Sequence, residues 1–148
     1  MSGDRPIIDE VDPAEAYTLL ETDPDTVLID VRTRAEWAFV GLPDLSALGH
    51  SLWPVEWLAF PSMAQNPEFL GDLAARMGDK PPSRLLFICR SGSRSMAAAQ
   101  LVATALAEQG MAAHCTNVAE GFEGDLDQGG HRGGVNGWKA RGLPWRQK

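Results

Sequence analysis

The sequence predicts an α/β fold in which a mainly parallel sheet is covered by helices on both faces. Short apolar segments alternate along the chain with amphipathic segments that open on helix-start signals, which is typical of parallel sheets. The apolar segments 27–31 and 85–89 contain a single charged residue between them, as expected for strands buried on both faces. With 148 residues the chain suits one domain, expected to span 1–148 with a core at about 8–145.

Strands and helices are expected in turn along the chain. Capping boxes at 12–15 and 33–36 predict two helix starts, because each places a glutamate three residues after an N-cap residue. A third helix opens at Asn66 and ends at Gly78, and Gly110 ends a fourth. The expected elements are strands at 7–8, 27–31, 51–53, 85–89 and 113–118, helices opening at 12, 33 and 66, a helix over about 95–109, a long loop over 41–61, a glycine-rich loop over 120–134, and a short final helix carrying Trp138.

Composition and charge exclude several classes of protein. The formal net charge of −7 argues against a nucleic-acid-binding surface and against attraction to an acidic membrane. The most apolar run, 96–107, is too short to span a bilayer, and residues 1–10 contain no apolar signal-peptide core. The two cysteines are expected to be free thiols in a reducing environment, so we expect a cytoplasmic protein.

The residues that carry chemistry begin where the apolar segment 85–89 ends. Cys89 stands at the carboxyl end of this strand, where parallel sheets usually bind their ligands. Gly92 allows the following loop to curl with its N–H groups pointing inward, and the start of the next helix adds partial positive charge. These features, with two arginines, favour a thiolate and an anion beside it. The expected anion-binding residues are Arg90, Ser91, Gly92, Ser93, Arg94 and Ser95.

Such a loop suits sulfur transfer through a covalent intermediate. The Cys89 thiolate would take a sulfur atom from a thiosulfate-like donor, the loop would stabilise the resulting persulfide, and a thiophilic acceptor would then remove the sulfur. This cycle needs no metal and no organic cofactor, and the scattered His50, His114 and His131 have no ligand spacing. Cys115 lies in an expected strand and is assigned to the core, although it is also a candidate to resolve an oxidised Cys89.

Three motifs resemble the rhodanese family of thiosulfate sulfurtransferases. The family's active loop, Cys-Arg-x-Gly-x-Arg-Ser, is matched at 89–95. Its upstream Asp-Val-Arg, with a glutamate four residues later, is matched by Asp30, Arg32 and Glu36, and its closing Gly-Gly, Trp and Gly-Leu-Pro are matched within 133–144. The resemblance covers nearly the whole chain and implies a three-layer domain with a five-stranded, mainly parallel sheet.

The resemblance also implies roles for single residues. Cys89 is expected to carry the persulfide within a ring of backbone N–H groups. Asp30, Arg32 and Glu36 are expected to give structural support rather than to react. Independently of the resemblance, the position of Arg94 beside the helix start predicts that it pairs inward with a carboxylate such as Glu36. From their place in the long loop, and not from the resemblance, Trp53 and Trp57 are candidates to shape the mouth of the pocket.

Two departures from the family pattern bear on the neighbouring loops. The family usually has Gly-His-Ile-Pro where this chain has Gly-Leu-Pro at 41–43, which predicts a reshaped loop there. The segment 120–132 is longer than in a minimal rhodanese. We expect a solvated loop insertion, with a lid or partner surface near the active loop as the alternative.

Two other functions stay open beside sulfur transfer. Cysteine phosphatases and arsenate reductases use a similar loop, but with Cys-x5-Arg spacing, whereas Cys89 and Arg94 are spaced Cys-x4-Arg. A non-catalytic rhodanese-like binding module usually lacks the cysteine that this chain retains. For sulfur transfer, the expected acceptors are a thiol or cyanide, with thioredoxin or a sulfur-carrier protein as protein candidates. We expect a monomer.

Overall fold

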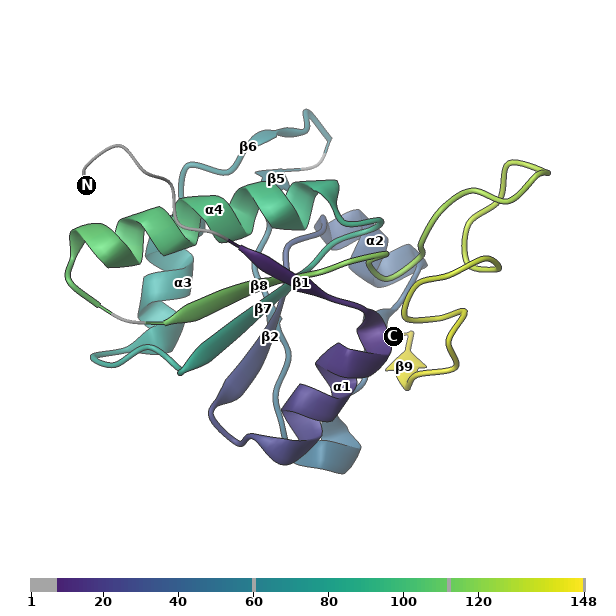
Figure 1. Ribbon diagram of the computed structural model, residues 1–148. Helices are drawn as coiled ribbons and strands as arrows, with labels where there is room; N and C mark the ends of the chain where they lie inside the picture. The colour runs from purple at the N-terminus through teal and green to yellow at the C-terminus, as the bar shows by residue number, and fades with distance from the viewer. Residues whose placement is uncertain (1–7, 60, 112, 148) are drawn as a thin grey trace.

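A five-stranded parallel sheet forms the centre of the computed structural model (Figure 1). The structure describes residues 8–59, 61–111 and 113–147. Its elements are β1 (Asp9–Val11), α1 (Pro13–Thr22), β2 (Thr26–Asp30), α2 (Arg34–Phe39), β3 (Leu42–Pro43), η1 (Ser46–Leu48, a 3₁₀ helix), β4 (Trp53–Pro54), β5 (Leu58–Ala59), β6 (Ala64–Gln65), α3 (Phe69–Met77), β7 (Arg84–Ile88), α4 (Ser93–Glu108), β8 (His114–Val118) and β9 (Trp145–Arg146).

The strand order is β1-β8-β7-β2-β4, and every neighbouring pair in this sheet is parallel. The strands β7 and β2 lie side by side near the middle, with Leu28 opposite Leu86 and Asp30 opposite Ile88. Both are almost fully buried, which explains why their sequences are continuous apolar runs rather than alternating ones. The predicted α/β fold with a mainly parallel sheet is confirmed.

Helices cover both faces of the sheet, and the alternation of side chains along β7 separates two cores. Leu85 and Phe87 point to the face covered by α3 and α4, and Cys89 continues this series. Leu86 and Ile88 point to the opposite face, where they pack with α1 and with apolar residues from the segment that follows β8. Figure 1 shows α4 and α1 on opposite sides of the sheet.

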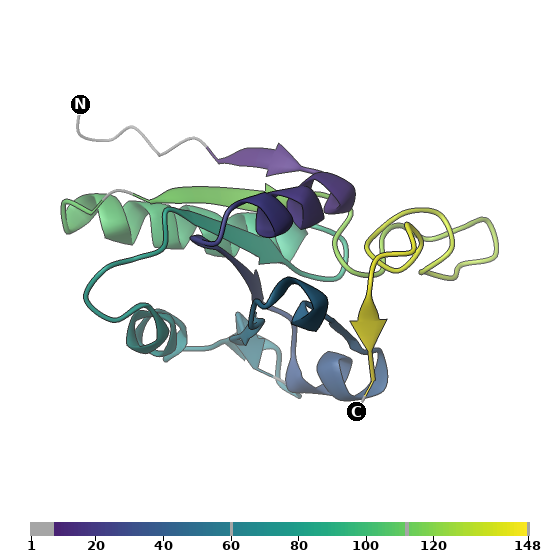
Figure 2. The same cartoon turned by 90° about the horizontal axis from the view of Figure 1, so that it is seen from below.

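The loops that follow the strands gather at one end of the sheet. Figures 1 and 2 both place α2, β9 and the long segment after β8 beyond the carboxyl ends of the strands. The strand β3 pairs antiparallel with β9, so the Gly-Leu-Pro departure at 41–43 lies against the C-terminal residues of the described chain. Any site at the carboxyl ends of the strands is therefore surrounded by these segments.

Both predicted capping boxes are present. In α1 the Asp12 carboxylate accepts from the Glu15 N–H, and the Glu15 carboxylate accepts from the Asp12 N–H, both within 3.1 Å. Thr33 and Glu36 form the same reciprocal pair at the start of α2. In contrast, α4 begins after Gly92 with no side-chain cap.

Several predicted boundaries differ from the structure. The strand expected at 7–8 is β1, two residues later, and residue 7 lies outside the described residues. The strand expected at 51–53 is Trp53–Pro54. The third helix begins at Phe69 rather than at Asn66, because the Asn66 side chain donates to the Glu56 carbonyl and accepts from the Glu68 N–H, which holds a turn there.

The predicted final helix around Trp138 is wrong. Residues 138–142 form turns, and Gly133, Gly137 and Gly142 adopt φ values of 93°, 98° and 75°, which no right-handed helix contains. The Trp138 ring is nevertheless fully buried, with its Nε1–H donating to the Pro144 carbonyl at 2.7 Å. The glycines therefore fold the chain back so that this tryptophan covers the α1 face of the sheet. In the described part of the chain, no helix is long and apolar enough to cross a membrane.

Candidate active site

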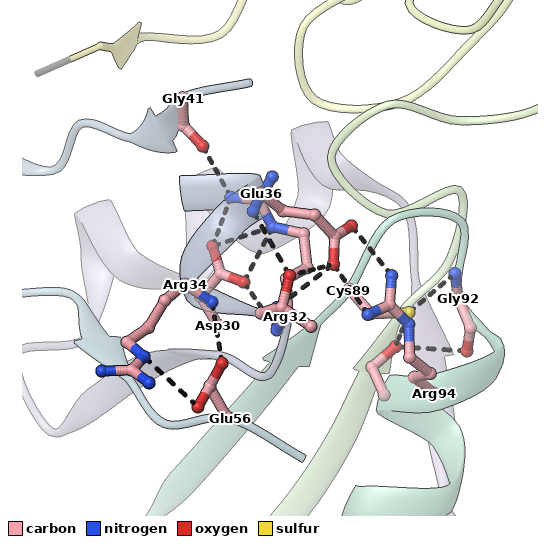
Figure 3. Close-up of polar contacts among 11 residues, drawn as sticks. Asp30, Arg32, Arg34, Glu36, Gly41, Glu56, Cys89, Gly92 and Arg94 are labelled. Carbon is pink, nitrogen blue, oxygen red and sulfur yellow. Dashed lines mark hydrogen bonds and ion pairs between the residues drawn. The ribbon is translucent and has the colours of Figure 1, made fainter. Parts of the chain in front are cut away.

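Cys89 is the first residue after β7 and stands at the carboxyl end of the sheet, as predicted (Figure 3). The residue is 1% exposed. The Gly92 N–H donates to Cys89 Sγ at 3.1 Å, and Ser95 Oγ lies 3.2 Å from the same sulfur. The sulfur is therefore enclosed by the loop that follows it and by the first turn of α4.

The loop takes this shape because of Gly92 and the uncapped start of α4. Gly92 has φ 118°, a backbone conformation that residues with a side chain rarely adopt. This turn brings the Gly92 N–H back onto the sulfur three residues earlier. Because no side chain caps α4, the partial positive charge of its N-terminus faces the loop. The arrangement favours negative charge on the sulfur.

A buried hydrogen-bond network supports the loop from below. Ser95 Oγ lies 3.1 Å from the Gly92 carbonyl oxygen and 2.5 Å from Asn117 Oδ1. The Asn117 amide in turn donates to Glu10 Oε2 at 2.8 Å and to the Gly92 carbonyl at 3.2 Å. The network joins β1, β8 and α4 directly behind the sulfur. Sequence reasoning missed Asn117, because an asparagine inside an expected strand has no motif around it.

Beside the sulfur, charged side chains of alternating sign run from Asp30 through Arg32 and Glu36 to Arg94 (Figure 3). The Arg94 guanidinium donates to both oxygens of Glu36, at 2.8 and 2.9 Å. Burial raises the pKa of Glu36, but hydrogen bonds from Arg94 and from the Thr33 N–H outweigh it and lower that pKa to about 2. Burial lowers the pKa of Arg94, and Glu36 more than compensates, so that pKa is raised. Both groups are thus held charged.

Asp30 and Arg32 form a fully buried ion pair at the end of β2. Arg32 Nη2 donates to Asp30 Oδ2 at 2.6 Å and to the Gly41 carbonyl at 2.8 Å. The guanidinium carbon lies 4.2 Å from the centre of the Phe122 ring. This geometry ties β2 to the loop before β3 and to the segment after β8, which agrees with structural support.

The segment after β8 lies against the back of the active loop. The Phe122 N–H donates to the Cys89 carbonyl at 2.8 Å. Gly121 has φ 66°, and a Cβ on it would lie 2.5 Å from the Cys89 carbonyl oxygen, so only glycine fits there. The predicted solvated loop is exposed only in part: residues 125–131 are exposed, whereas residues 121, 122 and 124 are buried. In the sequence, the pair Gly121-Phe122, a glycine followed by an aromatic residue, is the signal that could have indicated this packing.

Cys115 and Cys89 are both free and lie apart in the sheet. Leu85 of β7 is opposite Cys115, so Cys89 is offset by four residues, or about 13 Å along the strands. A disulfide needs Cα atoms within about 7 Å, so Cys115 cannot resolve Cys89 in this fold. Burial raises the pKa of Cys115 to about 12, which keeps its thiol protonated. Among the described residues, no group of three or more His, Cys, Asp and Glu could hold a metal ion.

The remaining predicted residues surround the mouth of the loop. Arg90, Ser93 and the half-buried Ser91 reach solvent. A cavity of about 460 Å³ borders the loop and is lined by Arg90 and Arg94 together with residues of α2 and of the segment after β8. Trp57 packs edge-on against Phe69, 5.1 Å between ring centres, and the lining of this cavity includes neither it nor Trp53. Both tryptophans are partly buried and pack against the core on the α3 and α4 face of the sheet.

These features define an α/β protein in which a cysteine at the carboxyl edge of a parallel sheet is enclosed by a backbone N–H and the start of α4. The model of the rhodanese-like domain matches residues 12–127, and the chain belongs to this family. A relative from Rickettsia rickettsii, "Uncharacterized protein RP600 homolog", is 33% identical over 132 residues, which cover 89% of this chain and 92% of the relative.

Two solved structures extend the comparison. The crystal structure of Rv0390 from M. tuberculosis is 43% identical, with a TM-score of 0.82 over 97% of this chain and all of the other. The solution structure of the polysulfide-sulfur transferase homodimer from Wolinella succinogenes is 23% identical, with a TM-score of 0.53 over 95% of this chain and 80% of that one. The second likeness shows the shared fold.

Proposed function

We propose that this protein is a sulfurtransferase that carries sulfur as a persulfide on Cys89. The observation that carries the proposal is the enclosure of Cys89 Sγ by the Gly92 N–H and the first turn of α4. Hydrogen-bond donors and a helix N-terminus stabilise an anionic sulfur, whether a thiolate or the terminal sulfur of a persulfide. The family of the chain supports the same chemistry.

In the first half-reaction, the Cys89 thiolate attacks the outer sulfur of a donor such as thiosulfate. A new S–S bond forms to Cys89 while the S–S bond of thiosulfate breaks, and sulfite leaves with the electron pair. In the second half-reaction a thiolate or cyanide attacks the outer sulfur of the persulfide. The acceptor leaves as a persulfide or as thiocyanate, and the Cys89 thiolate is regenerated. Neither half-reaction changes the overall electron count, so no external oxidant or reductant is needed.

The position of Arg94 favours sulfur transfer over phosphatase or arsenate reductase chemistry. A phosphatase needs the arginine of its loop to grip phosphoryl oxygens with its planar fork. Here both Nη atoms of Arg94 donate to the Glu36 carboxylate, so these donors are already paired within the protein. The pair holds the active loop to α2 and leaves Arg94 fewer free donors with which to bind phosphoryl oxygens.

A comparison of two activities tests the proposal. Purified protein is assayed for thiocyanate formation from thiosulfate and cyanide, and in parallel for hydrolysis of a phosphate ester. We expect thiocyanate from the wild type and from Cys115→Ser, none from Cys89→Ser, and no phosphate release. Phosphate release that depends on Cys89, without thiocyanate, would establish the phosphatase instead. If thiosulfate is not a donor, persulfide and polysulfide donors are assayed with thiol acceptors, including thioredoxin. The proposal is overturned if no pair of donor and acceptor gives sulfur transfer.

A further inference from the structure

The cavity beside the active loop is bordered by an unusual group of charges. Three arginines and two glutamates line it, a net charge of +1 in a chain whose formal net charge is −7. Arg94 and Glu36 neutralise each other as a bidentate pair. The charges left to act on a ligand belong to Arg90, Arg132 and Glu123.

Arg90 and Arg132 are both free to meet an anion. Within residues 8–59, 61–111 and 113–147, no carboxylate lies within 4.0 Å of either guanidinium. Both are on the lining of the same cavity, one from the active loop and one from the segment after β8. Two unpaired guanidinium groups attract an anion with more than one charge and can share its oxygens.

Arg132 is held in a fixed relation to the active loop although it is 43 positions away from Cys89 in the sequence (132 against 89). Arg132 Nη1 donates to the Gly124 carbonyl at 2.6 Å, and the Gly124 N–H donates to the Arg90 carbonyl at 3.1 Å. Two consecutive hydrogen bonds therefore join the Arg132 guanidinium to the Arg90 backbone. Gly124 has φ 75° and packs so closely on Asn136 that no side chain fits, which fixes the middle of this link.

We infer that Arg132 is a specificity-determining residue, which forms with Arg90 an anion-selecting mouth to the Cys89 loop. The mouth selects a small dianionic sulfur oxyanion, such as thiosulfate, over a neutral sulfur donor. Glu123 opposes this preference with its negative charge. The identity of the transferred atom rests on the proposed function, whereas the charge selection does not.

Alkylation of Cys89 tests the mouth without using sulfur transfer. The rate with iodoacetate, a monoanion, is divided by the rate with the neutral iodoacetamide, so that changes in thiolate reactivity cancel. One unit charge about 6 Å away through a water-like medium changes the energy of a monoanion by an amount that corresponds to about threefold in rate. We expect Arg132→Gln to lower the ratio about threefold and Glu123→Gln to raise it by a similar factor.

Two control variants separate charge from structure. Arg132→Lys keeps the charge and should keep the wild-type ratio. Lys80→Gln removes a positive charge from the exposed loop before β7, at the opposite end of the strands, and should leave the ratio unchanged. An unchanged ratio in Arg132→Gln overturns the inference, as does an equal effect from Lys80→Gln.

Kinetics with thiosulfate extend the test to the proposed donor. Because the electrostatic energy doubles for a dianion, Arg132→Gln should raise the KM for thiosulfate about tenfold and change kcat by less than about twofold. The two proposals fail in different ways. Shifted alkylation ratios without thiocyanate formation would support the mouth and contradict sulfur transfer, whereas thiocyanate formation with unshifted ratios would contradict the mouth alone.

Discussion

The ion pair between Glu36 and Arg94 is expected to contribute measurably to folding, and Glu36→Gln tests how much. The Glu36 and Arg94 side chains are 18% and 16% exposed, and the two Arg94 Nη atoms lie 2.8 and 2.9 Å from the two Glu36 oxygens. The pKa of Glu36 is lowered from 4.5 to about 2. A difference of that size between the unfolded and folded states corresponds to about 3 kcal/mol of stability at neutral pH. We expect Glu36→Gln to lower the free energy of unfolding at pH 7 by about 2–3 kcal/mol.

The sign of the pH dependence follows from the lowered pKa. Above pH 4.5 the Glu36 carboxyl is ionised in both states and the pair contributes fully. As the pH falls from 4.5 toward 2, the unfolded state takes up a proton before the folded state does, so the contribution is lost over this window. The difference in unfolding free energy between wild type and Glu36→Gln should therefore shrink toward zero as the pH approaches 2.

Urea unfolding, followed by circular dichroism at several pH values, measures both effects. Glu21→Gln is a matched control because Glu21 is exposed on α1 and has no ion pair among the described residues. It should change the unfolding free energy by less than about 0.5 kcal/mol at any pH. A Glu36→Gln variant as stable as wild type at pH 7, or a difference that does not change with pH, would refute this account of the pair.

Three further predictions concern residues around the loop. Gly121→Ala places a Cβ 2.5 Å from the backbone of the active loop and should cost more than about 2 kcal/mol in urea unfolding, whereas Gly142→Ala, with no atom within 4 Å, should cost about 1 kcal/mol; equal costs would contradict the packing. Burial raises the pKa of Cys115 to about 12, so Cys89→Ser protein should not react with a disulfide reagent at pH 8 until it is unfolded. Arg32→Met leaves a buried carboxylate unpaired and should cost about 3–5 kcal/mol by thermal or urea unfolding, while a loss below about 1 kcal/mol would show that the pair is dispensable.

Much of the fold could be predicted from the sequence because its signals are local. The capping boxes and the apolar runs of β2 and β7 depend on neighbouring residues alone, and these elements were predicted within one or two residues. The helix predicted around Trp138 is wrong because Gly133, Gly137 and Gly142 adopt positive φ values, which a right-handed helix does not contain. Tertiary packing of the buried indole, rather than helix propensity, decides the backbone there.

In the candidate site, too, the residues that belong to a local motif could be predicted, and those that reach the site from distant segments could not. The loop from Cys89 to Ser95 and the Arg94–Glu36 pair could be proposed from motif and charge. Asn117 and Arg132 could not, because each reaches the loop through contacts between distant segments, and no nearby residue marks either position. What the fold adds to the motif is a second layer of hydrogen bonds behind the sulfur and a second cation at its mouth.

Intact-protein mass spectrometry of the chain after incubation with thiosulfate tests the central claim most directly. The account predicts that the wild type gains the mass of one sulfur atom, that cyanide or a thiol removes it, and that Cys89→Ser gains nothing. Cys115→Ser should load as the wild type does. A folded wild-type protein that gains no sulfur from thiosulfate or polysulfide, or a Cys89→Ser variant that still gains it, would contradict the account.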